Sequence, residues 1–199
     1  MADHPYAELP PYGVPNMDKL QETREQVIAC TKCDLCKTRT NAVPGKGNQN
    51  AGIMFIGEAP GKTEDLQGEP FVGAAGKKLS SMLEKNGILR ESVYITNVVK
   101  CRPPDNRVPT EAERTSCREY LEKEMDLIKP KIICVLGNTA SNSILGQGEI
   151  TKNHGQTVKK DGRLYFLTFH PAAVIYNQEL GSLLEQDIQK LGKILLEMK

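Results

Sequence analysis

The sequence predicts an α/β fold, a three-layer sandwich in which a central, mainly parallel four-stranded sheet is flanked by helices. Four short runs of apolar and β-branched residues occur at wide intervals along the chain, at 53–57, 93–99, 131–137 and 164–169. Helical patterns separate these runs, and such alternation is typical of parallel strands joined by covering helices. A length of 199 residues with 39% hydrophobic content fits one hydrophobic core.

Capping and turn residues set the expected ends of several elements. Thr110 and Glu113 form a capping-box pattern, so a helix is expected to begin there and to stop before Pro130. Asp161-Gly162 is a strong hairpin signal, which predicts an antiparallel partner at 157–160 for the last strand. The other helices are predicted from apolar spacing at about 17–29, 75–86, 138–145 and 178–197.

Composition divides the chain into a flexible N-terminal arm, residues 1–16, and a single domain, residues 17–199. The arm holds four of the 12 prolines and little apolar periodicity. Neither a signal peptide nor a membrane-spanning run is evident, so a cytoplasmic location is expected. Lys and Arg total 26 against 25 for Asp and Glu, a net charge of +1. This balance excludes a global basic field, and any contact with nucleic acid must use local basic clusters.

Six cysteines in a chain without an export signal favour metal or cluster binding over disulfides. Cys30 and Cys33 are separated by two residues, so both thiolates can reach one metal or cluster, and Cys36 extends this run. The remaining ligands must come from far along the chain, and the candidates are Cys101 and Cys117. Cys134 lies within an apolar run and is expected in the core. The spacing alone leaves zinc, a 4Fe–4S cluster or no metal open.

A ligand pocket is predicted where polar and glycine-rich segments follow the strands. The segment 57–61, GEAPG, comes directly after the first strand, where open α/β sheets bind ligands. Phe71 lies in a glycine-rich stretch and could stack on a flat ligand, or could be a core anchor. Asn97 could bond a base edge or cap a turn. His170 follows the last strand and is either functional or structural.

Together these motifs resemble the family 4 uracil-DNA glycosylases, and the resemblance runs from Cys30 to the C-terminal helix. The segments occur in the order of that family: GEAPG, EDLQGEPFVGAAG, TNVVKCRPPDNRVPT and HPAAV. The cysteines match the family pattern of C-x2-C, a long gap, then C-x15-C. The resemblance implies a 4Fe–4S cluster as cofactor, with four ligands: Cys30, Cys33, Cys101 and Cys117. Cys36 falls outside the pattern and is interpreted as a spare thiol.

The resemblance also implies roles in a uracil pocket. Gly57, Glu58 and Ala59 would line the base, with Glu58 excluding the thymine methyl group. Phe71 would stack on the base, Asn97 would read its polar edge, and His170 would bond its O2.

The usual water-positioning carboxylate is absent from this chain. The better-known family 1 enzymes carry an aspartate where this chain has Ala59. Glu64 is therefore the favoured catalytic replacement, and Asn106 is a further candidate.

The implied function is monofunctional base excision repair. The enzyme would flip uracil out of double- or single-stranded DNA and hydrolyse its N-glycosidic bond, leaving an abasic site. Lys100, Arg102 and Arg107 are predicted to contact DNA phosphates. A monomer is expected, and a sliding clamp or a polymerase is a candidate partner. The alternative hypothesis is a catalytically inactive iron–sulfur or zinc DNA-binding module of a replication complex.

Overall fold

The computed structural model describes residues 15–146 and 148–198. The first helix, α1, spans Pro15–Ile28, close to the predicted 17–29. Most of the predicted N-terminal arm, residues 1–14, lies outside the described residues, so the arm stays a prediction. No helix in the described part of the chain is both long and apolar enough to cross a membrane.

A mixed six-stranded sheet forms the middle layer, in the order β1-β3-β2-β4-β6-β5. The four inner strands are parallel, as the sequence predicts, and the two edge strands are antiparallel to their neighbours. The prediction of a four-stranded sheet is therefore wrong in its strand count. The bounds are β1 Lys46–Gly47, β2 Ile53–Gly57, β3 Tyr94–Asn97, β4 Ile132–Leu136, β5 Thr157–Lys160 and β6 Arg163–Thr168.

The sequence predicts one of the two edge strands, β5, but not the other, β1. β5 pairs with β6 across the predicted hairpin, where Asp161 and Gly162 both have positive φ, at 50° and 74°. β1 has two exposed residues, too few for any alternation of apolar and polar positions. Its pairing depends on Gly47, because a Cβ atom there would lie 2.0 Å from the Val93 carbonyl oxygen.

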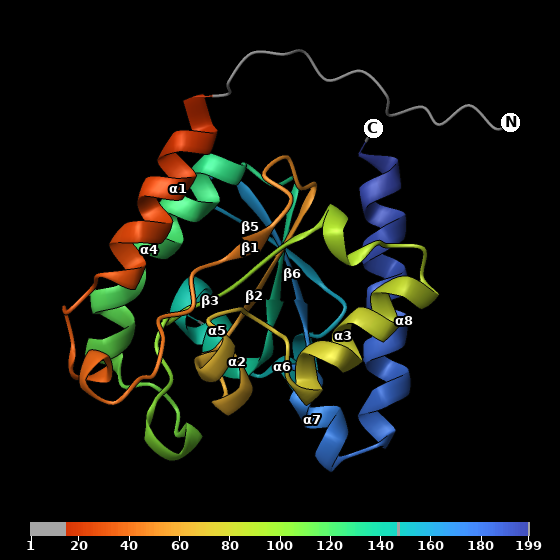
Figure 1. Ribbon diagram of the computed structural model, residues 1–199. Coiled ribbons are helices and arrows are strands. Elements are labelled where there is room, and N and C mark those ends of the chain that lie inside the picture. Colours follow the sequence, from red (N-terminus) through yellow and green to blue (C-terminus); the bar gives the residue numbers. More distant parts are fainter. Residues whose placement is uncertain (1–14, 147, 199) are drawn as a thin grey trace, which may run out of the picture.

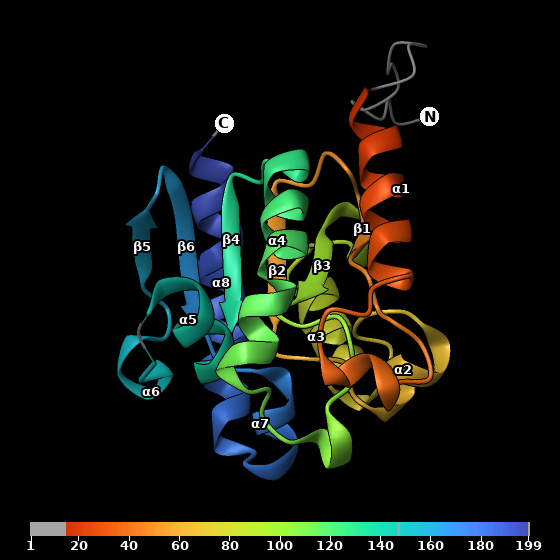
Figure 2. The same ribbon diagram turned by 90° about the vertical axis from the view of Figure 1, so that its left-hand side faces the viewer.

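Helices cover both faces of the sheet (Figures 1 and 2). Helices α1, α4 and α5 lie over one face, while α3 and α8 lie over the other. The predicted capping box at the start of α4 is confirmed by reciprocal bonds between Thr110 and Glu113. The remaining bounds are α2 Lys62–Gln67, α3 Ala74–Lys85, α4 Glu111–Ile128, α5 Gly137–Leu145, α6 Ile150–Asn153, α7 Pro171–Tyr176 and α8 Glu179–Glu197, with 3₁₀ turns at Asp34–Lys37, Arg90–Ser92 and Pro104–Asn106.

Strand periodicity divides the core between the two faces. Along β2, Met54 and Ile56 pack under α1 and α4, whereas Ile53 and Phe55 pack under α3 and α8. All five residues of β2 are buried, as expected for an inner parallel strand with both faces covered. The inner strands run in one direction, and their carboxyl ends meet at the lower edge of the sheet in Figure 2, near α2 and α7.

Candidate active site and cysteine cluster

A pocket of about 430 Å³ opens at the carboxyl edge of the sheet. It brings together most of the residues that the sequence predicts as a site, although they are far apart along the chain. These lining residues are Glu58, Ala59, Glu64, Phe71, Asn97, Asn106, Arg107 and His170. The pocket is also lined by residues that the prediction did not single out, among them Pro60, Lys62, Thr63, Gly73, Pro103 and Ala172.

Phe71 is held in place by two glycines that leave no room for a side chain. Its backbone has φ 54°, a conformation that bulky residues rarely adopt. A Cβ atom on Gly76 would lie 1.8 Å from the Phe71 carbonyl oxygen, and one on Gly57 would lie 2.6 Å from the ring. The absence of a side chain at Gly57 therefore lets the Phe71 ring pack directly against the end of β2. Backbone strain of this kind is often found at binding sites.

Asn97 ends β3 beside Gly57, its register partner on β2. The residue is 1% exposed and is among those that line the pocket. Its Oδ1 atom is buried and has no hydrogen-bond partner among the described residues. A buried acceptor without a donor is costly, on the order of 1–3 kcal/mol, so a ligand that supplies an N–H group here gains that energy.

His170 lies beside Phe71 in the pocket lining, with the two rings tilted and their centroids 5.6 Å apart. Its Nδ1 atom accepts a hydrogen bond from the Ala172 backbone N–H at 3.1 Å and so caps α7. Burial lowers the pKa of His170 to about 4, although the Glu64 carboxylate opposes the shift. The imidazole is therefore neutral at pH 7, and because Nδ1 is an acceptor, the proton resides on Nε2.

Glu64, on α2, fixes the loop that carries Phe71. Its Oε1 atom accepts hydrogen bonds from the backbone N–H groups of Val72, at 3.0 Å, and Gly73, at 2.7 Å. Gly73 is the N-cap residue of α3, so the carboxylate lies where the helix dipole favours negative charge. The sequence prediction gave Glu64 a catalytic role, and the structure adds this structural one.

The pocket rim is formed by the segment that joins β3 to α4. Asn106 is exposed, and its Oδ1 accepts a bond from Arg102 Nε at 2.8 Å. Arg107 forms two hydrogen bonds with Glu113, at 2.9 and 2.7 Å, and these bonds lower the pKa of Glu113 to about 2. Arg107 thus lines the pocket, and Arg102 bonds the lining residue Asn106. Their contact with phosphates stays a prediction.

The prediction that Lys100 contacts DNA phosphates is wrong. Lys100 is 1% exposed, and its ammonium group forms a buried ion pair with Glu124 at 2.6 Å. A partner on a neighbouring helix gave no signal in the sequence, where Lys100 is simply a cation beside the other basic residues of the segment.

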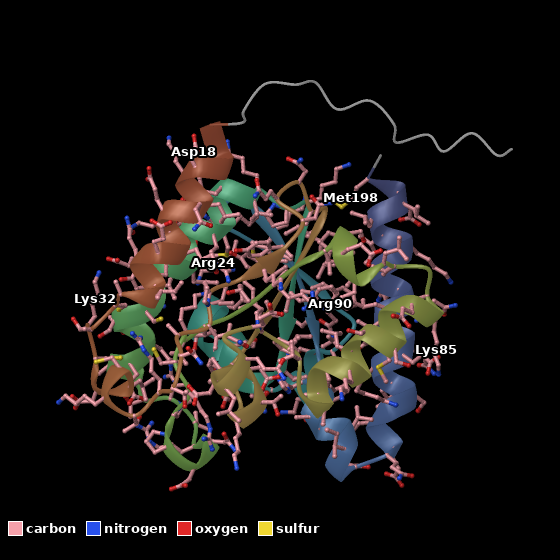
Figure 3. The ribbon with its side chains drawn as sticks, viewed as in Figure 1. Asp18, Arg24, Lys32, Lys85, Arg90 and Met198 are labelled. Carbon is pink, nitrogen blue, oxygen red and sulfur yellow. The ribbon has the colours of Figure 1, made fainter. Side chains whose placement is uncertain are left out.

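A second cavity gathers five of the six cysteines (Figure 3 shows sulfur atoms near Lys32). It lies between the end of α1, the following loop and the start of α4. The sulfur-bearing residues that line it are Cys30, Cys33, Cys36, Cys101 and Cys117. Cys134 lies apart, fully buried in β4, which confirms it as a core residue. Across residues 15–146 and 148–198, no three His, Cys, Asp or Glu residues form a group that could hold a metal ion.

Two of these sulfur atoms accept hydrogen bonds from the protein. Arg39 Nη1 donates to Cys101 Sγ at 2.9 Å, and the backbone N–H of Lys100 donates to Cys117 Sγ at 3.3 Å. Burial raises the pKa of Cys117 to about 12 and also raises that of Cys101. Binding of a metal would therefore have to displace protons from these thiols. Sequence reasoning missed Arg39, because no motif marks it.

The chain is thus an α/β protein with a pocket at the carboxyl edge of its sheet and a second cavity lined by cysteines. Comparisons with known proteins give its family. Residues 44–192 match the model of the uracil DNA glycosylase superfamily. A type-4 uracil-DNA glycosylase of Sulfurisphaera tokodaii is 48% identical over 92% of this chain and 88% of its own length. Those of Archaeoglobus fulgidus and Thermotoga maritima are 44% and 43% identical, over 89% and 83% of this chain and 94% and 89% of their own lengths.

The chain therefore belongs to the uracil-DNA glycosylase superfamily and, within it, to the type-4 uracil-DNA glycosylases. The resemblance seen in the sequence is confirmed.

Replacing Gly76 by Ala should displace Phe71 and destabilise the fold by about 1–3 kcal/mol, the usual cost of overpacking. The matched control is Gly192→Ala in α8, where the nearest atom to an added Cβ would be 3.6 Å away. That change should be neutral or should stabilise the helix by up to about 1 kcal/mol. Urea unfolding of both variants measures the difference, and equal effects would contradict the close approach of Gly76 to Phe71.

The lowered pKa of His170 predicts a pH-dependent contribution to stability. Between about pH 6.5 and pH 4 the unfolded chain binds a proton at His170 and the folded chain does not, so stability falls as the pH falls through this window. The advantage of the wild type over His170→Asn should shrink from pH 7 to pH 4.5 in urea unfolding. A constant difference would show that the folded pKa is not lowered.

Proposed function

We propose that this protein flips uracil out of DNA into the pocket at the carboxyl edge and hydrolyses its N-glycosidic bond. The observation that carries the proposal is the buried, unpartnered Oδ1 atom of Asn97, which lies in a pocket shared with Phe71 and His170. This atom requires a donor, and the N3–H group of uracil is a donor. The names of the relatives agree with the proposed substrate.

Asn97 explains how the pocket would select uracil over cytosine. Its Oδ1 can accept from uracil N3–H while its amide N–H donates to O4. Cytosine presents an unprotonated ring nitrogen and an amine at these positions, so it would leave buried groups unpaired. Phe71 supplies a flat surface for either base, and Glu58 supplies the wall proposed to exclude the thymine methyl group.

His170 would stabilise the leaving base. As the bond between C1′ and N1 breaks, its electron pair passes to uracil, and negative charge gathers partly on O2. The Nε2–H group of the neutral imidazole is the available donor, because Nδ1 is engaged by Ala172. A donor fixed in advance at a point of developing charge is typically worth several kcal/mol, about 2.7–4 for one oxyanion-type donor.

Glu64 is the residue that we favour for positioning the water. The oxygen of that water bonds to C1′, and the water proton passes to the carboxylate. Only Oε1 of Glu64 bonds Val72 and Gly73, so Oε2 is the oxygen assigned to the water. Asn106 is the further candidate, but its Oδ1 is already bonded to Arg102 at the rim.

The proposal includes a 4Fe–4S cluster held by Cys30, Cys33, Cys101 and Cys117. What supports the cluster is that the four thiols line one cavity and that two of the sulfur atoms already receive N–H donors. In the described residues the thiols do not yet stand together as a metal-binding group, so binding would have to draw them closer. A bound cluster would tie the segment after α1 to the segment around α4, and such hydrogen bonds to sulfur tune its potential. Cys36 lines the same cavity and is proposed as a non-ligand.

Arg102 and Arg107 are proposed to contact DNA phosphates beside the pocket. A cytoplasmic location, a monomeric state and a sliding clamp or polymerase as partner stay predictions.

Incubation with a uracil-containing oligonucleotide, followed by alkali, tests the activity, because an abasic site is cleaved by base. The wild type should give strand breaks. His170→Ala should lose about 10²-fold or more in single-turnover rate while keeping its affinity for DNA, the scale of one lost donor. If stoichiometric wild-type enzyme gives no breaks, the inactive DNA-binding alternative gains instead.

Iron and acid-labile sulfide analysis tests the cluster. The purified protein should contain both in equal amounts, and Cys101→Ala should lose them. Cys36→Ala is the matched control from the same cavity and should retain them. Loss of iron in Cys36→Ala with retention in Cys101→Ala would reassign the ligand, and a zinc-loaded wild type would refute the cluster.

A further inference from the structure

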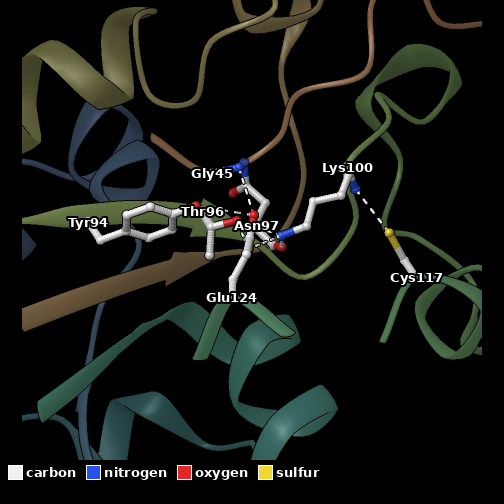
Figure 4. A network of polar contacts seen from close by, with 7 residues as sticks. All are labelled: Gly45, Tyr94, Thr96, Asn97, Lys100, Cys117 and Glu124. Carbon is white, nitrogen blue, oxygen red and sulfur yellow. Dashed lines mark hydrogen bonds and ion pairs between the residues drawn. The ribbon is translucent and has the colours of Figure 1, made fainter. Parts of the chain in front are cut away.

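Lys100 and Glu124 form an ion pair inside the protein, between the end of β3 and α4 (Figure 4). Both side chains are 2% exposed. The ammonium Nζ of Lys100 has three acceptors: Glu124 Oε2 at 2.6 Å, Thr96 Oγ1 at 2.5 Å and the Asn97 carbonyl oxygen at 2.8 Å. Its three N–H donors are therefore all used.

Glu124 is equally well satisfied. Its Oε2 also accepts from the Thr96 hydroxyl at 2.7 Å, and its Oε1 accepts from the Gly45 backbone N–H at 2.8 Å and from the Tyr94 hydroxyl at 3.5 Å. A buried network with every member satisfied holds a single arrangement of its parts. Among the residues described around this network, the unpaired side-chain atom is the buried Oδ1 of Asn97, a residue that lines the pocket.

Stability alone is a weak reason for such a pair. Apolar side chains of similar volume often replace a buried ion pair at no loss of stability, because two charges must be removed from water to form it. The pair instead holds the backbone of Asn97, because the Lys100 ammonium donates a hydrogen bond to the Asn97 carbonyl oxygen. The next N–H, that of Val98, bonds Gly57 at 2.9 Å, so the peptide unit after Asn97 is fixed at both ends.

Lys100 also joins the pocket to the cysteine cavity. The backbone N–H of Lys100 donates to Cys117, while the side chain bonds Glu124. Cys117 and Glu124 are seven residues apart on α4 and so share one face of the helix. Residue 100 is thereby attached to α4 at two points, one of which is a sulfur atom proposed to bind the cluster.

We propose that Lys100, paired with Glu124, is a positioning residue that holds Asn97 at the angle needed to read the base, and that it ties this angle to α4 and the cysteine site. The inference rests on the proposed function. Lys100 acts through Asn97 and does not touch the substrate.

A double-mutant cycle tests this role. The pair variant Lys100→Met with Glu124→Gln removes both charges at similar volume and leaves no buried charge unpaired. Its single-turnover excision rate should fall about 10-fold or more, the scale of a misplaced group, while its affinity for the oligonucleotide and its iron content stay unchanged. In the Asn97→Ala background the same pair change should have no further effect on the rate, because the group it positions is gone.

Tyr94→Phe is the matched control, since it removes a hydroxyl from the far end of the same network without touching Asn97, and its rate should equal that of the wild type. If the pair variant does not fold, Lys100→Arg replaces it in the cycle, because a planar guanidinium keeps the charge but not the three donor directions.

An unchanged rate in the pair variant, or the same fractional loss with and without Asn97, would overturn the inference. Absence of excision by the wild type would instead overturn the proposed function.

Discussion

The parallel register of β3, β2, β4 and β6 is the constraint on which the site depends. Because the strands run together, the residues that follow them are delivered to one edge of the sheet, whatever their separation along the chain. Gly57 and Asn97 are register partners at that edge, and Leu136 pairs with Thr168, two residues before His170. The ladder hydrogen bonds thus fix the backbone positions of Asn97, proposed to read the base, and of His170, proposed to stabilise charge, relative to each other.

Glycine and charge then decide how close the groups can come. Phe71 can pack over Gly57 only because neither that residue nor Gly76 carries a side chain. Burial keeps His170 neutral, while Glu64 provides nearby negative charge and holds the Phe71 loop. The pocket is therefore assembled by backbone approach and desolvation as much as by the polar side chains that line it.

Apolar periodicity and strand-end motifs are local signals, so they predicted the inner strands, the long helices and a pocket that includes Phe71, Asn97 and His170. The family resemblance, and not these patterns, supplied Glu64 and Asn106. The prediction failed for features that depend on contacts between segments far apart in the chain. The strand Lys46–Gly47 exists only through its pairing with β3, so no pattern marks it. Lys100 looked like a surface cation because its partner, Glu124, is 24 residues away on another element. Arg39 likewise gave no signal, because Cys101, to which it donates a hydrogen bond, is 62 residues away in the sequence.

The unpaired oxygen of Asn97 has a consequence for the end of the reaction as well as for its start. Free uracil offers the same N3–H group and the same flat ring as uracil still joined to DNA. If uracil N3–H pairs with the buried Asn97 Oδ1 as proposed, the same contact stabilises the released base as well as the base still joined to DNA. In the proposed mechanism, the Asn97 contact that selects uracil therefore also slows the release of the free base.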